Sequence, residues 1–177
     1  GRTHPVFRGV AIRSTTACLG HRIAVIPTPA EVRNRAVWIV EHFEGEAAQG
    51  TAFFLQGVGL VTAAHCVVSA SEVDVYHPSK PANKFKATVH KIDEHRDLAV
   101  LTHSIPEAEY LELQRSTQTI SVGSASTAVG YPNFGPGDQL NLRNGNVSSL
   151  SVKSGVRRIE VQQNLSQGMS GRPLLDW

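Results

Sequence analysis

A histidine, an aspartate and a serine have the side-chain types that nucleophilic hydrolysis requires. His65 follows an apolar segment that ends in two alanines, Asp97 directly precedes the apolar segment 98–101, and Ser170 lies in a glycine-rich turn. In such a set the imidazole accepts the proton of the serine hydroxyl, while the carboxylate fixes the imidazole tautomer and stabilises the imidazolium. The three residues are therefore a candidate catalytic triad.

The segment Gly168-Met169-Ser170-Gly171 could also hold the negative charge that this reaction creates. Glycines around a serine permit a tight turn that aims the backbone N–H groups of Gly168 and Ser170 at one point. Two such donors form an oxyanion hole, and removal of one typically lowers the rate by about a hundredfold to a thousandfold. Gly-x-Ser-Gly is a weak signal by itself, but the order His, Asp, Ser matches one known chain order of this site.

The elements that must position these residues are β-strands. Short apolar or alternating segments are separated by turn-forming residues, which is typical of a β-sandwich or β-barrel. A single turn at 29–32 and a short helix or linker at 106–113 are the helical exceptions. The predicted strands are Val6–Ile12, Arg22–Ile26, Ala36–His42, Thr51–Leu55, Gly59–Thr62, Val73–Tyr76, Ala87–Lys91, Leu98–Thr102, Thr127–Val129, Gly145–Leu150 and Arg158–Val161.

The predicted strands divide into two groups, at 36–103 and 120–175. Each group would hold about six strands, enough to close a small barrel. His65 and Asp97 lie in the first group and Ser170 lies in the second. A cleft between two barrels would therefore bring the three side chains together.

The composition indicates one folded domain and argues against several function classes. The chain has 177 residues, 41% of them hydrophobic and 18% charged, and a formal net charge of +2. Arg157-Arg158 is the only basic doublet, so a nucleic-acid partner is not expected. The apolar stretch 58–68 is far too short to span a bilayer. No export leader is visible at the start of the sequence, and a mature or excised domain would look the same.

Neither the cysteines nor the histidines indicate a disulfide framework or a metal site. The two cysteines, Cys18 and Cys66, fit small buried thiols. A metal-dependent hydrolase would need a ligand spacing that His90, His95 and His103 lack, and His-Glu-x-x-His does not occur. No metal or cofactor is therefore expected.

Three motifs make the chain resemble the trypsin/chymotrypsin family of serine proteases, in its bacterial, high-temperature-requirement-like branch. Thr62–Cys66 resembles the family's histidine motif, Asp97–Leu101 its aspartate motif, and Gly168–Gly171 with Pro173 its serine motif. Flanking segments that resemble strands of bacterial members are Gly50–Phe54, Val129–Pro132 and Gly145–Ser148.

The resemblance implies an all-β fold of two six-stranded antiparallel Greek-key barrels with the active site between them. A single domain would span 1–177, with the first barrel at 36–105 and the second at 115–177. The implied activity is that of a serine endopeptidase, which cleaves a polypeptide substrate through an acyl-enzyme. Family habit favours a secreted or periplasmic location.

Three positions depart from the family pattern. Arg172 stands where the family usually has glycine, so a positive φ there would strain the chain. Met169 stands where members activated by an N-terminal salt bridge carry aspartate, so activation of that kind is not expected. Cys66 has no partner cysteine near Gly50, so the family's bridge beside the histidine is not expected, and a bond to Cys18 would need two distant regions to meet.

The chain ends seven residues after Ser170, whereas the family continues with two strands and a terminal helix. Residues 6–14 and 20–32 resemble those strands and the final helical turn, and Trp177 followed by Gly1 resembles a hairpin between strands. Segment 1–35 is therefore expected to complete the second barrel. Circular permutation, a fragment cut across two tandem domains, and an unrelated N-terminal extension are the three explanations that stay open.

The resemblance also identifies a substrate pocket. Its floor would come from the stretch before the nucleophile, where no acidic residue stands at Asn164, so a preference for Lys or Arg is not expected. If the N-terminal segment completes the barrel, residues 12–14 would pair with the substrate backbone. The candidate pocket residues are Asn164, Ser166, Gln167, Ile12, Arg13 and Ser14.

A catalytically impaired relative that binds peptides or partners is the leading alternative. The intact triad argues against this alternative, whereas Arg172 and the early chain end argue for it.

Overall fold

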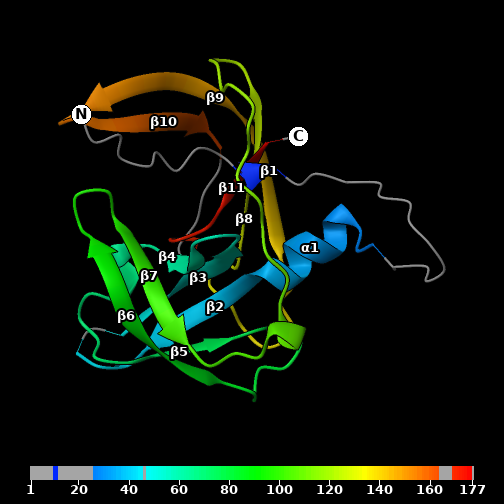
Figure 1. The fold of residues 1–177 in the computed structure, drawn as a ribbon, viewed down its shortest axis with the longest axis vertical. Helices are drawn as coiled ribbons and strands as arrows, with labels where there is room; N and C mark the ends of the chain where they lie inside the picture. The colour runs from blue at the N-terminus through cyan, green and yellow to red at the C-terminus, as the bar shows by residue number, and fades with distance from the viewer. Residues whose placement is uncertain (1–9, 12–25, 46, 164–168, 177) are drawn as a thin grey trace.

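The computed structural model describes residues 10–11, 26–45, 47–163 and 169–176, and within them the protein is mostly β (Figure 1). A closed barrel and a separate twisted sheet lie one above the other in this view. The elements are β1 Val10–Ala11, α1 Pro29–Ala36, β2 Val37–His42, β3 Ala48–Leu55, β4 Gly59–Thr62, η1 Ala64–Cys66, β5 Val73–Tyr76, β6 Phe85–Asp93, β7 Leu98–His103, η2 Glu107–Glu109, β8 Ala125–Gly130, β9 Asn141–Lys153, β10 Val156–Gln162 and β11 Leu174–Asp176.

The first barrel closes in the order β2-β3-β4-β7-β6-β5. Alternation along these strands sends one set of side chains inward, where Trp38, Phe54 and Leu60 are almost completely buried. Trp38 meets the edge of Phe54 at a ring-centroid distance of 5.6 Å. The predicted six-stranded first barrel is confirmed.

The second unit is an open five-stranded sheet in the order β1-β11-β8-β9-β10. A second closed barrel is therefore not confirmed within the described residues, where β1 and β10 are unjoined edges and β1 pairs with β11 in parallel. Closure needs a strand that reaches both edges. Most of the predicted strand 22–26 lies outside the described residues.

The short strand β1 bears on the permutation hypothesis. Val10 pairs with Leu175, and Ala11 pairs with Asp176, so the N-terminal segment does lie beside the strand that follows Ser170. A hairpin joining the chain ends would make this pairing antiparallel, whereas the observed pairing is parallel.

The helix α1 is longer than the single turn predicted from Pro29–Val32. Thr28 accepts a hydrogen bond from the Glu31 amide through its hydroxyl, and the Glu31 carboxylate accepts one from the Thr28 amide. This capping box and a proline in the first turn start a helix efficiently. The predicted helix or linker at 106–113 contains only the 3₁₀ turn η2.

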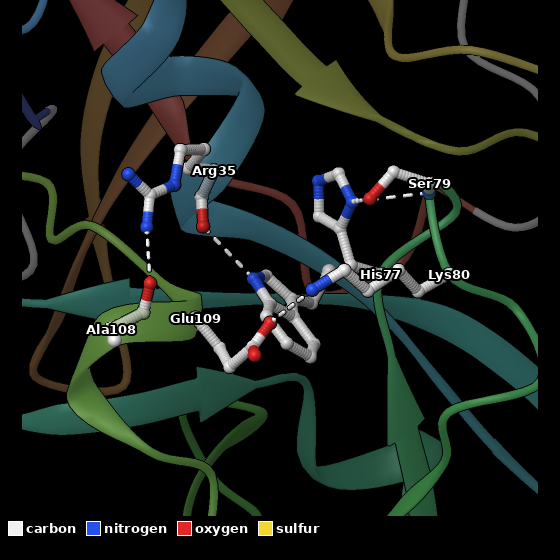
Figure 2. A network of polar contacts seen from close by, with 7 residues as sticks. Arg35, His77, Ser79, Lys80, Ala108 and Glu109 are labelled. Atoms are coloured by element: carbon white, nitrogen blue, oxygen red, sulfur yellow. Dashed lines mark hydrogen bonds and ion pairs between the residues drawn. The ribbon is translucent and has the colours of Figure 1, made fainter.

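A polar network joins α1 to the barrel and to η2 (Figure 2). His77 bonds the Asn34 carbonyl through Nε2 at 2.7 Å, and its Nδ1 lies 2.7 Å from the Ser79 hydroxyl. Arg35 donates to the Ala108 carbonyl, and Lys80 pairs with Glu109. Burial lowers the pKa of His77, which is 9% exposed, so the neutral ring is favoured there.

The two units share an apolar interface. Val129, Tyr131 and Leu175 of the second unit pack in one buried cluster with residues of the first barrel. The Tyr131 hydroxyl donates to the Val37 carbonyl at 2.9 Å, and the Tyr131 amide donates to the Thr51 hydroxyl at 3.2 Å. These contacts bond the second unit to the first barrel. No helix in the described part of the chain is long and apolar enough to cross a membrane.

Candidate active site

His65 and Asp97 form a doubly hydrogen-bonded pair at the rim of the first barrel. His65 lies in η1 directly after β4, and Asp97 lies in the turn between β6 and β7. The His65 Nδ1 is 2.7 Å from Asp97 Oδ2, and the His65 backbone amide donates to Oδ1 at 2.9 Å. One carboxylate thus orients both the ring and the backbone of the histidine.

The backbone of Asp97 is left-handed, with φ 55°. Aspartate tolerates this region better than most residues, but such a conformation persists only where surrounding contacts hold it. Asp93 supplies some of them, since its carboxylate accepts from the Arg96 amide at 3.0 Å and from the Arg96 guanidinium at 2.7 Å. The ion pair lowers the pKa of Asp93, chiefly through hydrogen bonds from Arg96.

Ser170 is attached to the first barrel through its backbone. The Thr51 amide of β3 donates to the Ser170 carbonyl at 2.7 Å, so the serine turn lies against the barrel that carries the other two residues. Gly171, with φ 80°, follows in the left-handed region. A Cβ there would overlap the Thr51 carbonyl oxygen and lie 2.5 Å from the Thr62 hydroxyl, so only glycine fits.

The expected strain at Arg172 is absent. Among described non-glycine residues, positive φ values occur at Asp97, Asn133 and Ser154, and Arg172 does not belong to this group. The left-handed step falls on Gly171 instead. Arg172 donates to the Met169 carbonyl at 2.8 Å, and partial burial lowers the pKa of its guanidinium. The Met169 side chain is fully buried.

Several predicted site residues lie outside the described residues. These are Gly168 of the oxyanion hole and the pocket residues Asn164, Ser166, Gln167, Ile12, Arg13 and Ser14. Within the described chain, no hydrogen bond joins His65 to Ser170. Catalytic hydrogen bonds are often long in the free enzyme and tighten with substrate.

Cys66 is a free, buried thiol behind the histidine, while Cys18 lies outside the described residues. A Cβ on Gly50 would come within 2.6 Å of the Cys66 sulfur and 3.1 Å of the Ser170 carbonyl oxygen, so Gly50 leaves room for both. Burial, followed by the charge of Asp97, raises the pKa of Cys66 to about 11. The neutral thiol is therefore favoured over the thiolate.

Two of the three histidines considered as metal ligands have other contacts. His95 bonds the Ser154 carbonyl, and His103 accepts from the Ile105 amide and contacts the ring of Phe54. No group of three His, Cys, Asp or Glu side chains able to hold a metal occurs in the described part of the chain.

The chain matches the family model described as "Trypsin-like peptidase domain" over residues 50–176. This match covers His65, Asp97 and Ser170. The chain belongs to the trypsin-like peptidase family. No curated protein matches it.

Solved structures of serine proteases share the fold of this trypsin-like peptidase domain. The inactive form of the Rv3671c protease of M. tuberculosis is 25% identical, with a TM-score of 0.64 over 85% of this chain and 80% of that chain. The HtrA-type protease AlgW with tripeptide is 24% identical, with a TM-score of 0.66 over 85% of this chain and 51% of that one. The serine endoprotease from Yersinia pestis is 21% identical, with a TM-score of 0.65 over 85% and 54% of the two chains.

The sequence analysis of the peptidase domain missed the supporting role of Thr51 and the contact made by His95. Thr51 stands in a segment that resembles a bacterial family strand, but its bond to Ser170 joins residues far apart in the chain. The bond between His95 and Ser154 likewise spans 59 positions. Neither partner could be chosen from local pattern.

Proposed function

We propose that the domain is a serine endopeptidase that hydrolyses peptide bonds through an acyl-enzyme. Ser170 attacks the substrate carbonyl, and its oxygen forms the ester bond while His65 takes the hydroxyl proton. His65 then returns that proton to the leaving amine, and water releases the acyl group by the same route. Asp97 orients His65 and stabilises its charged form.

The observation that carries this proposal is the pair of hydrogen bonds from Asp97 to the ring and the backbone amide of His65. The side chains of His65 and Asp97 are 57% and 49% exposed, so the pair faces solvent and is open to a substrate. The bond from Thr51 to Ser170 holds the serine turn against the same barrel. A neighbour solved with a tripeptide supports a polypeptide as substrate.

The oxyanion hole of the proposed mechanism is formed by the backbone N–H groups of Gly168 and Ser170. The turn at Gly171, with φ 80°, supports this assignment because a reversal of the chain directly after the serine frees its amide for a ligand. No metal or cofactor has a role in the proposed steps.

Labelling by a fluorophosphonate tests the proposed nucleophile. The reagent should modify Ser170 covalently with loss of fluoride, and peptide mapping should identify the modified residue. Ser170→Ala should abolish labelling, whereas Ser148→Ala, a serine on β9, should keep it. Labelling that persists in Ser170→Ala would disprove the assignment.

A catalytically impaired, peptide-binding domain is the second candidate, favoured by the lack of a hydrogen bond between His65 and Ser170 within the described residues. A wild-type protein that binds peptides but neither reacts with the fluorophosphonate nor cleaves a peptide library would support this candidate.

We further propose that segment 1–35 completes the second barrel and that residues 12–14 then line the substrate cleft together with Asn164, Ser166 and Gln167. The unjoined edges of the sheet and the pairing of Val10 with Leu175 support this proposal. A peptide-library profile led by Lys or Arg would contradict the pocket assignment, because no carboxylate stands at Asn164.

A further inference from the structure

The turn that carries Asp97 is shaped by contacts within it. Asp97 has φ 55°, and its amide donates to the Glu94 carbonyl at 3.2 Å. The contacts between Asp93 and Arg96 also lie within this turn. Such contacts set the shape of the turn, but none of them reaches the unit that carries Ser170.

A contact from the second unit reaches this turn. The His95 Nε2 lies 3.1 Å from the backbone carbonyl oxygen of Ser154, at the tip of the β9–β10 hairpin. Ser154 and Gly155 have φ values of 51° and 75°, as a tight two-residue hairpin turn requires. The hairpin extends from the sheet above the barrel, with its tip near the β6–β7 turn in Figure 1.

We propose that His95 is a positioning residue, which holds Asp97 in place by bonding the β6–β7 turn to the tip of the β9–β10 hairpin. This inference rests on the proposed function, because its consequence is the alignment of the His65–Asp97 pair with Ser170.

The donor and the acceptor of this hydrogen bond follow from the chemistry of the two groups. A carbonyl oxygen only accepts, so the His95 Nε2 must carry the proton. Both the neutral Nε2–H tautomer and the imidazolium can donate this bond. The partner is a backbone atom, which means that the hairpin conformation, and not the Ser154 side chain, supplies the acceptor.

The position of His95 explains why loss of this hydrogen bond would disturb the geometry of the His65–Asp97 pair. His95 and Asp97 are separated by one residue in a four-residue turn, so a displaced His95 carries Asp97 with it. Asp97 in turn holds both the ring and the amide of His65. Small errors in such an alignment lower the rate of the chemical step more than substrate binding.

Three variants test the proposal kinetically. His95→Leu removes the donor and should lower kcat about threefold to tenfold, with KM changed less than about twofold, as expected for one lost hydrogen bond. His95→Gln keeps a terminal N–H donor and should restore part of the loss. His90→Leu, at an exposed histidine on β6, should retain wild-type kcat.

A double-mutant cycle separates positioning from a general structural role. If His95 acts through Asp97, His95→Leu should have no further effect on kcat in an Asp97→Asn background. Equal losses in both backgrounds would overturn the proposal. Thermal unfolding of each variant shows whether the fold is retained.

Hydrogen exchange provides a readout that does not need turnover. The amide of His65 donates to Asp97, so its exchange should accelerate in His95→Leu and not in His90→Leu. Unchanged exchange and unchanged kcat in His95→Leu would disprove the positioning role. A wild-type protein without labelling or turnover would instead disprove the proposed function, while the exchange experiment would still decide the inference.

Discussion

The first barrel and the five-stranded sheet differ in whether they are closed and in where their apolar side chains lie. The barrel is closed, and Trp38, Phe54 and Leu60 are almost completely buried inside it. Within the described residues, the sheet has unjoined edges at β1 and β10, and Val152 on β9 is 66% exposed. His65 and Asp97 thus lie on the closed unit, whereas Ser170 lies just before β11 of the open sheet.

This difference suggests a division of labour. A close-packed barrel holds its residues to one geometry, since interiors pack as densely as organic crystals. The barrel therefore suits the His65–Asp97 pair, whose proposed role in catalysis requires a fixed geometry. The sheet reaches the same site through the contacts of Thr51 with Ser170 and of Tyr131 with Val37.

The largest expected effect tests whether the two units act as one site. Ser170→Ala should lower turnover by roughly a million-fold, as in comparable triads, and His65→Ala should cost about as much. The double variant should lose little more than either single variant, because the two residues act as a unit. Single-turnover assays with an activated ester measure all three, and multiplicative losses would show independent roles.

A somewhat smaller loss of kcat is expected when the His65–Asp97 pair of the first barrel is changed. Asp97→Asn preserves shape but favours the wrong imidazole tautomer, which should lower kcat on the order of ten thousand-fold. The free energy of unfolding should change little by comparison, since the pair is about half exposed. Parallel measurements of kcat and urea unfolding check this separation.

Core truncation should distinguish the units by stability. Phe54 is 1% exposed and stacks on Tyr110 at a centroid distance of 3.8 Å, so Phe54→Ala should destabilise the protein by about 3–5 kcal/mol. Val152→Ser on the exposed face of β9 should change stability by no more than about 0.5 kcal/mol. Similar urea midpoints for the two variants would contradict the contrast between the units.

The smallest effect concerns the junction of α1 with the barrel. Burial lowers the pKa of His77 below its ordinary value of 6.5, so the unfolded chain binds this proton more readily than the folded chain. The free energy of unfolding should be greatest above about pH 6.5 and fall as the pH drops through the folded pKa. His77→Gln should flatten this part of the plot of unfolding free energy against pH. A slope that the substitution leaves unchanged would show that His77 is not its source.

Local patterns in the sequence determined the strands of the first barrel and the family of this protein. Alternating apolar residues predicted the strands of the first barrel, because side chains point to opposite faces of a strand with a period of two. The surroundings of His65, Asp97 and Ser170 predicted the family, which the family match confirms, and the catalytic triad stays a prediction. The capping box at Thr28 and Glu31 would have predicted a longer helix than the single turn expected at Pro29.

Only the tertiary structure decided how these parts meet. The bonds of Asp97 to His65, of Thr51 to Ser170 and of His95 to Ser154 each depend on partners brought together by folding. The close approach of Gly171 to Thr51 and Thr62, at a positive φ that Arg172 does not have to adopt, is also a product of folding. Strand periodicity is a local property of the chain, whereas these contacts join residues that are distant in sequence, so no local pattern encodes them.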